Sequence, residues 1–226
     1  MDEETAAMLD HVRTALPESG AHGFDHTLRV VRLAEEIGAR EGADMAILIP
    51  AALFHDIARP LEEETGAPHE EEGARMAESY LRSVRYPEDH IPGIVHAIRA
   101  HRYSSGIAPQ TLEARVLSDA DNLDAMGAVG IARTFMQAAT LRQEGNGSTR
   151  KGATGDLPEG EGVQETRRVS TGGIADATAH FHDKLLNLKD RMYTTTARNI
   201  AGERHALLVA FLAALEDESS PWRIKG

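Results

Sequence analysis

The sequence predicts an all-α fold, and three observations support this prediction. Aromatic residues make up only 4% of the chain, whereas Ala, Leu, Glu and Arg, which favour helices, are abundant. Apolar residues recur every three or four positions, the spacing of one helix face, along most of the chain. The alternation that is typical of strands is scarce. Because 226 residues are enough for one substantial core, we expect a single compact helical domain over residues 1–226.

The N-terminal part predicts two amphipathic helices followed by an apolar one. The first spans about residues 3–16, and the second begins near His26. The third, in the segment ADMAILIPAALFHDIA, is apolar on nearly every side, as expected of a central helix that others surround. Pro50 is expected to kink this helix or to redirect the chain. His55 and Asp56 stand at its end.

The middle of the chain predicts one exposed loop and four more helices. Pro60 and the acidic run EEE that follows it are expected to form a solvated surface loop. Turns rich in glycine, proline and serine separate the helices that come next. These helices are expected at about residues 68–85, 88–102, 109–120 and 122–142.

The composition changes near Gly145 and stays polar and glycine-rich up to Gly173. Such a segment cannot bury an apolar face, so we expect a mobile insertion loop at about residues 145–173, long enough to act as a lid. Two helices then complete the chain, at about residues 175–200 and 203–217.

Charge and composition exclude several classes of function. The net charge of -12 disfavours binding to a nucleic-acid polymer, which depends on Lys and Arg along the phosphate backbone. The chain has no Cys, so a metal would have to use imidazole and carboxylate ligands. No apolar run approaches the roughly 18 residues of a membrane span, and the acidic N-terminus is unlike a signal peptide. We therefore expect a cytoplasmic protein without a membrane partner, and the sequence leaves open whether it forms a homodimer.

The adjacent residues His55 and Asp56 are the first candidates for chemistry. They close an apolar helix, where a buried charge and a polar ring are costly unless they have partners. One explanation is that His55 bonds a backbone carbonyl while Asp56 caps a neighbouring helix. The other is that both bind a metal ion.

A second candidate is the segment DADNLD, which brings Asp119, Asp121 and Asp124 close together. Three neighbouring carboxylates repel one another, and a divalent cation would relieve part of that repulsion. The alternative is that Asp121 or Asn122 caps the helix that follows. With His26, two histidines and two aspartates give a mixed nitrogen and oxygen site that suits Mn, Fe, Co, Ni, Zn or, less well, Mg.

A His, then a His-Asp pair, then an Asp, in this order, resemble the signature of the HD-domain superfamily of metal-dependent phosphohydrolases, which are helical bundles. The segments HTLRV, LFHDIA, HAIRAH, LEARVLSDADNLDAMGAVGIAR and KLLNLKDRMYTTTARNIAGER look like one bacterial and archaeal subgroup of predicted HD hydrolases. The resemblance covers most of residues 22–217, the expected core. The metal ligands that it implies are His26, His55, Asp56 and Asp121.

The resemblance also implies roles around the metal. The expected catalytic residues are Asp56, His101, Arg29 and Lys184. The expected substrate contacts are His69, His96, His101, Lys184 and Asp124, and for His96 a purely structural role is an equal alternative. Asp119 and Asp124 are also candidates for supporting the ligands or capping helices. Some HD proteins hold a second metal with extra histidines between the HD pair and the last Asp, and His69 and His101 fall in that interval.

The function that the resemblance implies is hydrolysis of a phosphate ester or anhydride by one divalent ion such as manganese, with room for a second ion. The expected substrate is a small phosphorylated molecule, most naturally a nucleotide. The reaction would be either cleavage of a nucleoside triphosphate to monophosphate and pyrophosphate or removal of phosphate from a nucleotide. The alternatives are a regulatory module that binds a nucleotide without turnover and, less favoured, a di-iron HD-fold oxygenase.

Overall fold

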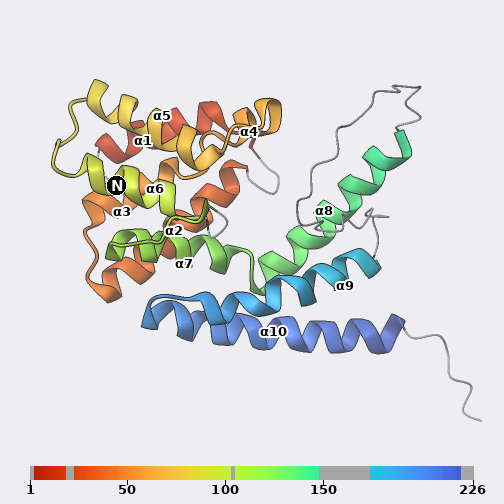
Figure 1. Ribbon diagram of the computed structural model, residues 1–226. Coiled ribbons are helices and arrows are strands. Elements are labelled where there is room, and N and C mark those ends of the chain that lie inside the picture. Colours follow the sequence, from red (N-terminus) through yellow and green to blue (C-terminus); the bar gives the residue numbers. More distant parts are fainter. Residues whose placement is uncertain (1–2, 19–22, 103–104, 148–173, 220–226) are drawn as a thin grey trace, which may run out of the picture.

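The fold is built around α3 (Met45–Phe54), a short helix without a polar face. The computed structural model describes residues 3–18, 23–102, 105–147 and 174–219, and the regular elements in these ranges are all helical (Figure 1). The predicted all-α class is therefore confirmed. The other elements, in chain order, are α1 (Glu3–Ala15), α2 (Phe24–Glu41), α4 (Arg59–Thr65), α5 (His69–Ser83), α6 (Ile91–Ala100), α7 (Leu112–Asp124), α8 (Gly127–Gly147), α9 (Ile174–Asp183), the 3-10 helix η2 (Leu185–Arg191) and α10 (Thr195–Ser219).

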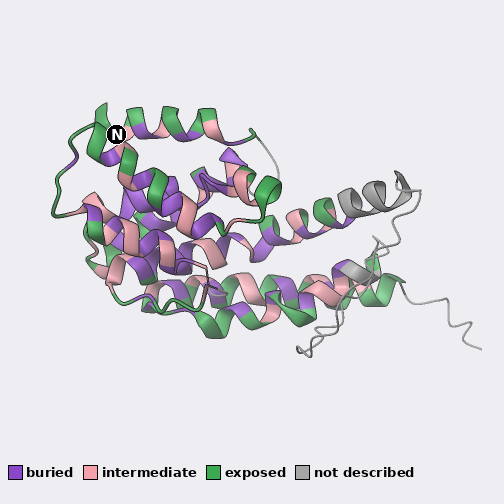
Figure 2. Ribbon diagram, turned by 45° about the horizontal axis from the view of Figure 1, so that its top comes forward, coloured by how far each residue is buried: buried purple, intermediate pink, exposed green. Residues whose placement is uncertain are grey.

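The helix α3 is central because other helices cover it on every side. It packs against α1, α2, α5, α6 and α7, and its residues from Ala51 to Phe54 are at most 1% exposed. Burying a large apolar side chain stabilises a fold by about 1.5–3 kcal/mol, so this helix contributes much of the core. Figure 2 shows that the buried residues line the surfaces where helices meet. His55 and Asp56, which follow α3 directly, are thus held in the most rigid part of the molecule.

The helix α2 lies against both α3 and α7, and a glycine allows the first of these contacts. A Cβ atom at Gly38 would overlap the side chain of Leu48 on α3 and lie 3.1 Å from the sulfur of Met45. The helix ends at Gly42, whose φ of +81° is a left-handed conformation that glycine adopts without strain. The close approach brings His26, near the start of α2, toward the end of α3.

Of the C-terminal elements, α8, η2 and α10 contact α7, and α9 packs against α8 and η2 (Figure 1). The predicted single helix over 175–200 is wrong, because α9 ends at Asp183 and the next α-helix begins only at Thr195. The reason is tertiary: Asp119 on α7 accepts hydrogen bonds from the backbone amides of Tyr193 and Thr194 (both 2.8 Å). The Thr194 hydroxyl also donates to this carboxylate (2.7 Å). These bonds redirect the chain and start α10 earlier than predicted.

Two further predictions meet the limits of the described residues. The insertion loop expected at about 145–173 lies outside them except for its first three residues, which belong to α8. Among the helices that the structure describes, none combines the length and the hydropathy required to cross a bilayer.

Candidate metal centre

Four buried histidines converge on one region of the molecule. His26 lies in the first turn of α2, His55 follows α3, His69 begins α5 and His101 follows α6. Each is at most 1% exposed. Each ring donates a hydrogen bond from Nδ1. His26 donates to Asp124 Oδ2 (2.7 Å) and His69 to Glu62 Oε2 (2.9 Å). His55 donates to the Ala52 carbonyl (2.7 Å) and His101 to the Ile98 carbonyl (2.6 Å). The Nε2 atoms are left to face one another, the orientation in which second partners hold metal-binding histidines.

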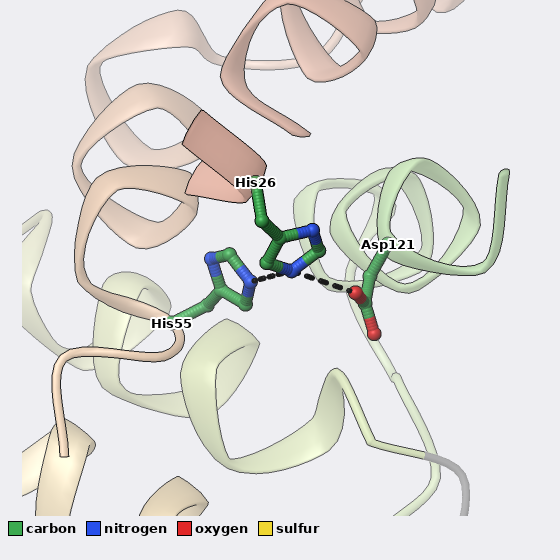
Figure 3. A group of neighbouring side chains, drawn as sticks. All are labelled: His26, His55 and Asp121. Carbon is green, nitrogen blue, oxygen red and sulfur yellow. Dashed lines mark hydrogen bonds and ion pairs between the residues drawn. The ribbon is translucent and has the colours of Figure 1, made fainter. Parts of the chain in front are cut away.

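The first group of ligand atoms comes from His26, His55 and Asp121 (Figure 3). The Nε2 atoms of His26 and His55 are 3.3 Å apart, and His26 Nε2 is 3.4 Å from Asp121 Oδ1. The three residues come from α2, the end of α3 and α7, so the packing of three helices in the core creates this group.

The second group of ligand atoms comes from Asp56, His69 and His101. Asp56 Oδ1 lies 3.3 Å from His69 Nε2 and 3.8 Å from His101 Nε2, and these two nitrogen atoms are 3.4 Å apart. All three side chains are at most 1% exposed. The two additional histidines of the resemblance therefore stand beside the HD pair.

Asp56 belongs to both groups, because its two carboxylate oxygens face in different directions. Oδ2 lies 3.5 Å from His26 Nε2 and 3.7 Å from His55 Nε2, whereas Oδ1 faces His69 and His101. A carboxylate placed in this way can bridge two cations, as in sites that hold two metals about 3.5–4 Å apart.

The donor atoms fit a divalent metal in type and spacing. The distances given above run from 3.3 to 3.8 Å, and all ligand atoms within each of the two groups lie within 4.8 Å of one another. Ligands bonded at about 2.0–2.2 Å to one ion stand about 3–3.5 Å from one another, so a small contraction around a cation would complete either group. Imidazole and carboxylate without thiolate suit Mn, Fe, Co, Ni and Zn. The residues can therefore hold a metal ion, and the geometry leaves its identity open.

The electrostatics of the cluster favour a bound positive charge. Burial alone would lower the pKa of His26, but hydrogen bonds to three surrounding carboxylates outweigh it and raise the pKa to about 10. Burial would raise the pKa of Asp121 and Asp124, but their contact with His26 outweighs it, so that both values fall, to about 2 for Asp124. Burial lowers the pKa of His55 to about 4 and also lowers that of His101. The ionised carboxylates of Asp121 and Asp124 thus stabilise a positive charge at this place, which His26 carries when no metal is bound, while His55 and His101 are neutral imidazoles.

A cavity of about 380 Å³ opens beside Asp121, and its walls are strongly basic. Leu185 and Leu188 form an apolar part of the wall, and Asp121 supplies its acidic side chain. The cationic residues of the wall are Arg59, Arg102, Arg133, Lys184 and Arg191. In a chain of net charge -12, such a concentration of positive charge indicates a site for a polyanion.

The structure brings most of the predicted site residues together. The ones that line the two groups are His26, His55, Asp56, Asp121, His69 and His101. Lys184, predicted to act on the substrate, lines the cavity.

The predicted substrate contact His96 is not in the cluster. Its Nε2 atom accepts a hydrogen bond from the backbone amide of Gln110 (3.0 Å), in the segment that precedes α7. His96 and His101 are five residues apart, which turns them about 140° from one another around a helix axis. His101 faces the metal groups, and His96 therefore faces elsewhere.

Arg29 and Asp124 lie behind the ligands. Asp124 is 1% exposed. Its carboxylate accepts hydrogen bonds from His26 Nδ1, from Arg29 Nε (2.7 Å) and from Arg133 Nη1. Arg29 also donates to Asp25 Oδ2 (2.8 Å). These contacts fit the expectation that Asp124 supports a ligand, whereas direct contact of either residue with substrate stays a prediction.

The alternatives left open by the sequence are now decided in part. Asp121 lies inside α7 and so does not cap the helix that follows. His55 does bond a backbone carbonyl, as the first explanation required, but its Nε2 atom still faces the first group. The hydrogen bond of the first explanation is therefore present, and it is compatible with metal binding through Nε2, which stays a prediction.

Sequence reasoning missed the residues that surround the second group. The acidic run after Pro60, expected as a solvated loop, forms α4, and Glu62 from this helix bonds His69. Burial would raise the pKa of Glu62, but the charges of His69 and of Arg59 and Arg102 outweigh it and lower the pKa. Asp56, Arg59 and Glu62 are spaced three residues apart, which is the spacing of one helix face. This spacing is a signal for a helix, but the run of acidic residues favours a loop instead.

The comparisons with known proteins agree with this geometry. A family model described as HD domain matches residues 23–126, which contain all the ligands named above. The uncharacterised protein YpgQ of Bacillus subtilis is 34% identical over 207 residues, which are 89% of this chain and 86% of YpgQ.

Solved structures extend the match to the whole fold. A crystal structure of Bacillus subtilis YpgQ in complex with ADP has a TM-score of 0.67 at 30% identity, covering 96% of this chain and 95% of the other. A predicted HD superfamily hydrolase from an uncultured Thermotogales bacterium has a TM-score of 0.66 at 29% identity, covering 95% and 92%. On sequence, ligand order and fold, the chain belongs to the HD-domain superfamily of hydrolases.

Proposed function

We propose that this protein is a divalent-metal-dependent phosphohydrolase that acts on a nucleotide. The observation that carries the proposal is that Asp121, a ligand of the first group, lines a cavity with five cationic side chains. The YpgQ structure in complex with ADP supports a nucleotide as the phosphorylated ligand. One ion would be held by His26, His55, Asp56 and Asp121, and a second by Asp56, His69 and His101.

The metal and the cavity would have separate tasks. A divalent cation supplies Lewis acidity toward a phosphate oxygen and lowers the pKa of water. Guanidinium groups of Arg102 and Arg133 would bind phosphate oxygens through pairs of N–H donors, and Lys184 would add a point charge. Leu185 and Leu188 would keep part of the wall dry, which strengthens these contacts.

The number of cations favours a substrate with more than one phosphate. A nucleoside triphosphate carries about four negative charges near neutral pH. Five cationic side chains line the wall, and three of them, Arg59, Arg102 and Arg133, also pair with carboxylates of the protein. Several cations around one cavity still suit the charges of a triphosphate better than those of a monophosphate. We therefore favour cleavage of a nucleoside triphosphate to monophosphate and pyrophosphate over removal of phosphate from a monophosphate.

The test is the product pattern of the purified chain loaded with Mn, Co, Ni, Fe, Zn or Mg. We expect pyrophosphate from a panel of nucleoside triphosphates, and Asp121→Ala should abolish its release. Asp10→Ala, a loss of one exposed carboxylate on α1, is the matched control and should keep the full rate. No release of phosphate or pyrophosphate with any metal contradicts the proposal. Tight nucleotide binding by calorimetry without product would instead identify a regulatory module, and oxygen-dependent product with two irons an oxygenase.

A further inference from the structure

Glu62 on α4, the first residue of an acidic run, is the centre of a network of charged side chains. Its carboxylate accepts three hydrogen bonds from donors that can all carry positive charge: Oε2 accepts from His69 Nδ1 (2.9 Å) and Arg59 Nη1 (3.0 Å), and Oε1 accepts from Arg102 Nη1 (3.0 Å). The side chain is 25% exposed. Hydrogen bonds of this charge-assisted kind are about twice as strong as neutral ones, so one carboxylate fixes three side chains.

The three partners connect two parts of the site. His69 presents Nε2 to the second metal group, 3.3 Å from Asp56 Oδ1. Arg59 and Arg102 line the basic cavity. Arg59 also donates from Nε to Asp56 Oδ1 (2.9 Å), so the network closes on the carboxylate that both metal groups share.

The first metal group has a counterpart of Glu62. Asp124 accepts from the Nδ1 atom of His26 and from the guanidinium groups of Arg29 and Arg133, and Arg133 lines the same cavity. Each group of ligands is thus backed by a carboxylate that bonds one histidine and two arginines, and on the side of Glu62 a second carboxylate, Glu70 Oε2, also lies 3.2 Å from His69 Nδ1. The arrangement around Glu62 thus repeats the one around Asp124. This repetition argues that the contacts of Glu62 belong to the site and are not a surface ion pair.

We propose that Glu62 is a positioning residue that orients His69 toward the second metal group and holds Arg59 and Arg102 in the wall of the cavity. The inference rests on the proposed function where it concerns substrate, and on the geometry alone where it concerns His69. A carboxylate at Nδ1 fixes the tautomer and the direction of the ring, and removing such a partner typically lowers metal affinity or activity by about 10–100-fold.

The first measurement uses Glu62→Gln, which keeps the shape of the side chain and removes its charge. Glu63→Gln is the matched control, because Glu63 is exposed and next in the chain and its change removes the same charge. Binding of Mn is followed by equilibrium dialysis with metal analysis. We expect two ions per chain in the control and an affinity for one of them about 10–100-fold lower in Glu62→Gln. Equal isotherms for the two variants, or a single ion in the control, overturn the proposal.

A second measurement does not require a metal or an activity. In the metal-free chain, nitrogen-15 spectra of the histidine rings should show His69 with its proton on Nδ1 in the wild type and in Glu63→Gln. The signal should change in Glu62→Gln, while that of His55, whose Nδ1 donates to a backbone carbonyl, stays constant. An unchanged His69 signal overturns the proposal even when the variant's fold is disturbed elsewhere.

The third measurement concerns substrate. With a nucleoside triphosphate, Glu62→Gln should raise KM about tenfold through Arg59 and Arg102, and adding Arg102→Gln should raise it by less than it does in the wild type. Fully independent effects would overturn the part of the proposal that concerns the cavity. If no substrate is hydrolysed by any form, but metal binding and ring signals change as expected, then the proposed function fails and the positioning role of Glu62 stands.

Discussion

The two halves of the metal centre are built alike but supported differently. In the first half His26 is backed by Asp124, whose side chain is 2% exposed and lies on α7, the same core helix as Asp121. In the second half His69 is backed by Glu62, whose side chain is 25% exposed. Glu62 lies on α4, a helix of seven residues with none of them buried. The carboxylate that supports a histidine thus belongs to a core helix in the first half and to a peripheral helix in the second.

This difference teaches that the halves should not bind metal equally. Charges that are shielded from water interact more strongly with their partners than charges that solvent and salt screen. A short peripheral helix also opens locally at a lower free energy than a core helix does. We expect the first half to fill at low metal concentration and the second half only at a higher one.

The largest effect is expected from Asp56→Asn, which removes the charge that both halves share. Hydrolysis should fall by about 10³-fold, equivalent to about 4 kcal/mol of transition-state stabilisation, and bound metal should decrease in both halves. Kinetics with a nucleoside triphosphate and metal analysis after dialysis measure these changes. A variant that keeps one ion at wild-type affinity would show that Asp56 serves only one half.

A smaller effect is expected from Asp124→Asn, which weakens the support of the first half. The affinity for the first ion should fall by about 10–100-fold, because His26 loses the charged partner of its Nδ1 atom. Asp25→Asn is the control, since Asp25 bonds Arg29, makes no hydrogen bond to the His26 ring among the described residues, and has a side chain that is 45% exposed. Metal titration followed by calorimetry distinguishes the two variants. Equal losses would assign the effect to Arg29 and not to His26.

The smallest effects concern the helix contacts that carry each half. Gly38→Ala should crowd Leu48 at the contact of α2 with α3. Overpacking lowers the free energy of unfolding by about 1–3 kcal/mol, and the higher helix propensity of Ala offsets about 1 kcal/mol of this loss. Gly73→Ala on α5 should stabilise by up to about 1 kcal/mol, since its Cβ would lie 3.5 Å from the Phe54 carbonyl, an ordinary contact.

Thermal unfolding checks this pair. At about 2–4 °C per kcal/mol, we expect the melting temperature to fall by about 3 °C for Gly38→Ala and to rise by about 2 °C for Gly73→Ala. If the melting temperature rises for both variants, then the contact of α2 with α3 at Gly38 has as much room for a methyl group as the surroundings of Gly73 on α5.

The ligands of the first half could be predicted from the sequence, because each one lies in a local motif. His26 starts a helix, His55 and Asp56 end an apolar one, and Asp121 lies in a cluster of carboxylates. Their order along the chain was enough to indicate the family, and the family supplied the fold.

The surroundings of the ligands could not be predicted, because they depend on packing between distant segments. Arg133 contacts His26 across 107 positions of the chain, and Glu62 reaches Arg102 across 40. No local spacing encodes such contacts. The break between α9 and α10 has the same origin, since it follows from the bonds of Asp119 to a segment more than 70 positions away.

The bonds of Asp119 restrict how the chain between η2 and α10 can move. Asp119 is two residues before Asp121 on α7, and it ties the start of α10 to that helix by three hydrogen bonds. The wall that η2 contributes to the cavity cannot move away from the metal ligands together with the start of α10 unless all three bonds break in the interior, at a cost of about 1–3 kcal/mol each. A substrate of the proposed reaction would therefore enter and leave past the other walls of the cavity, while the start of α10 stays in place.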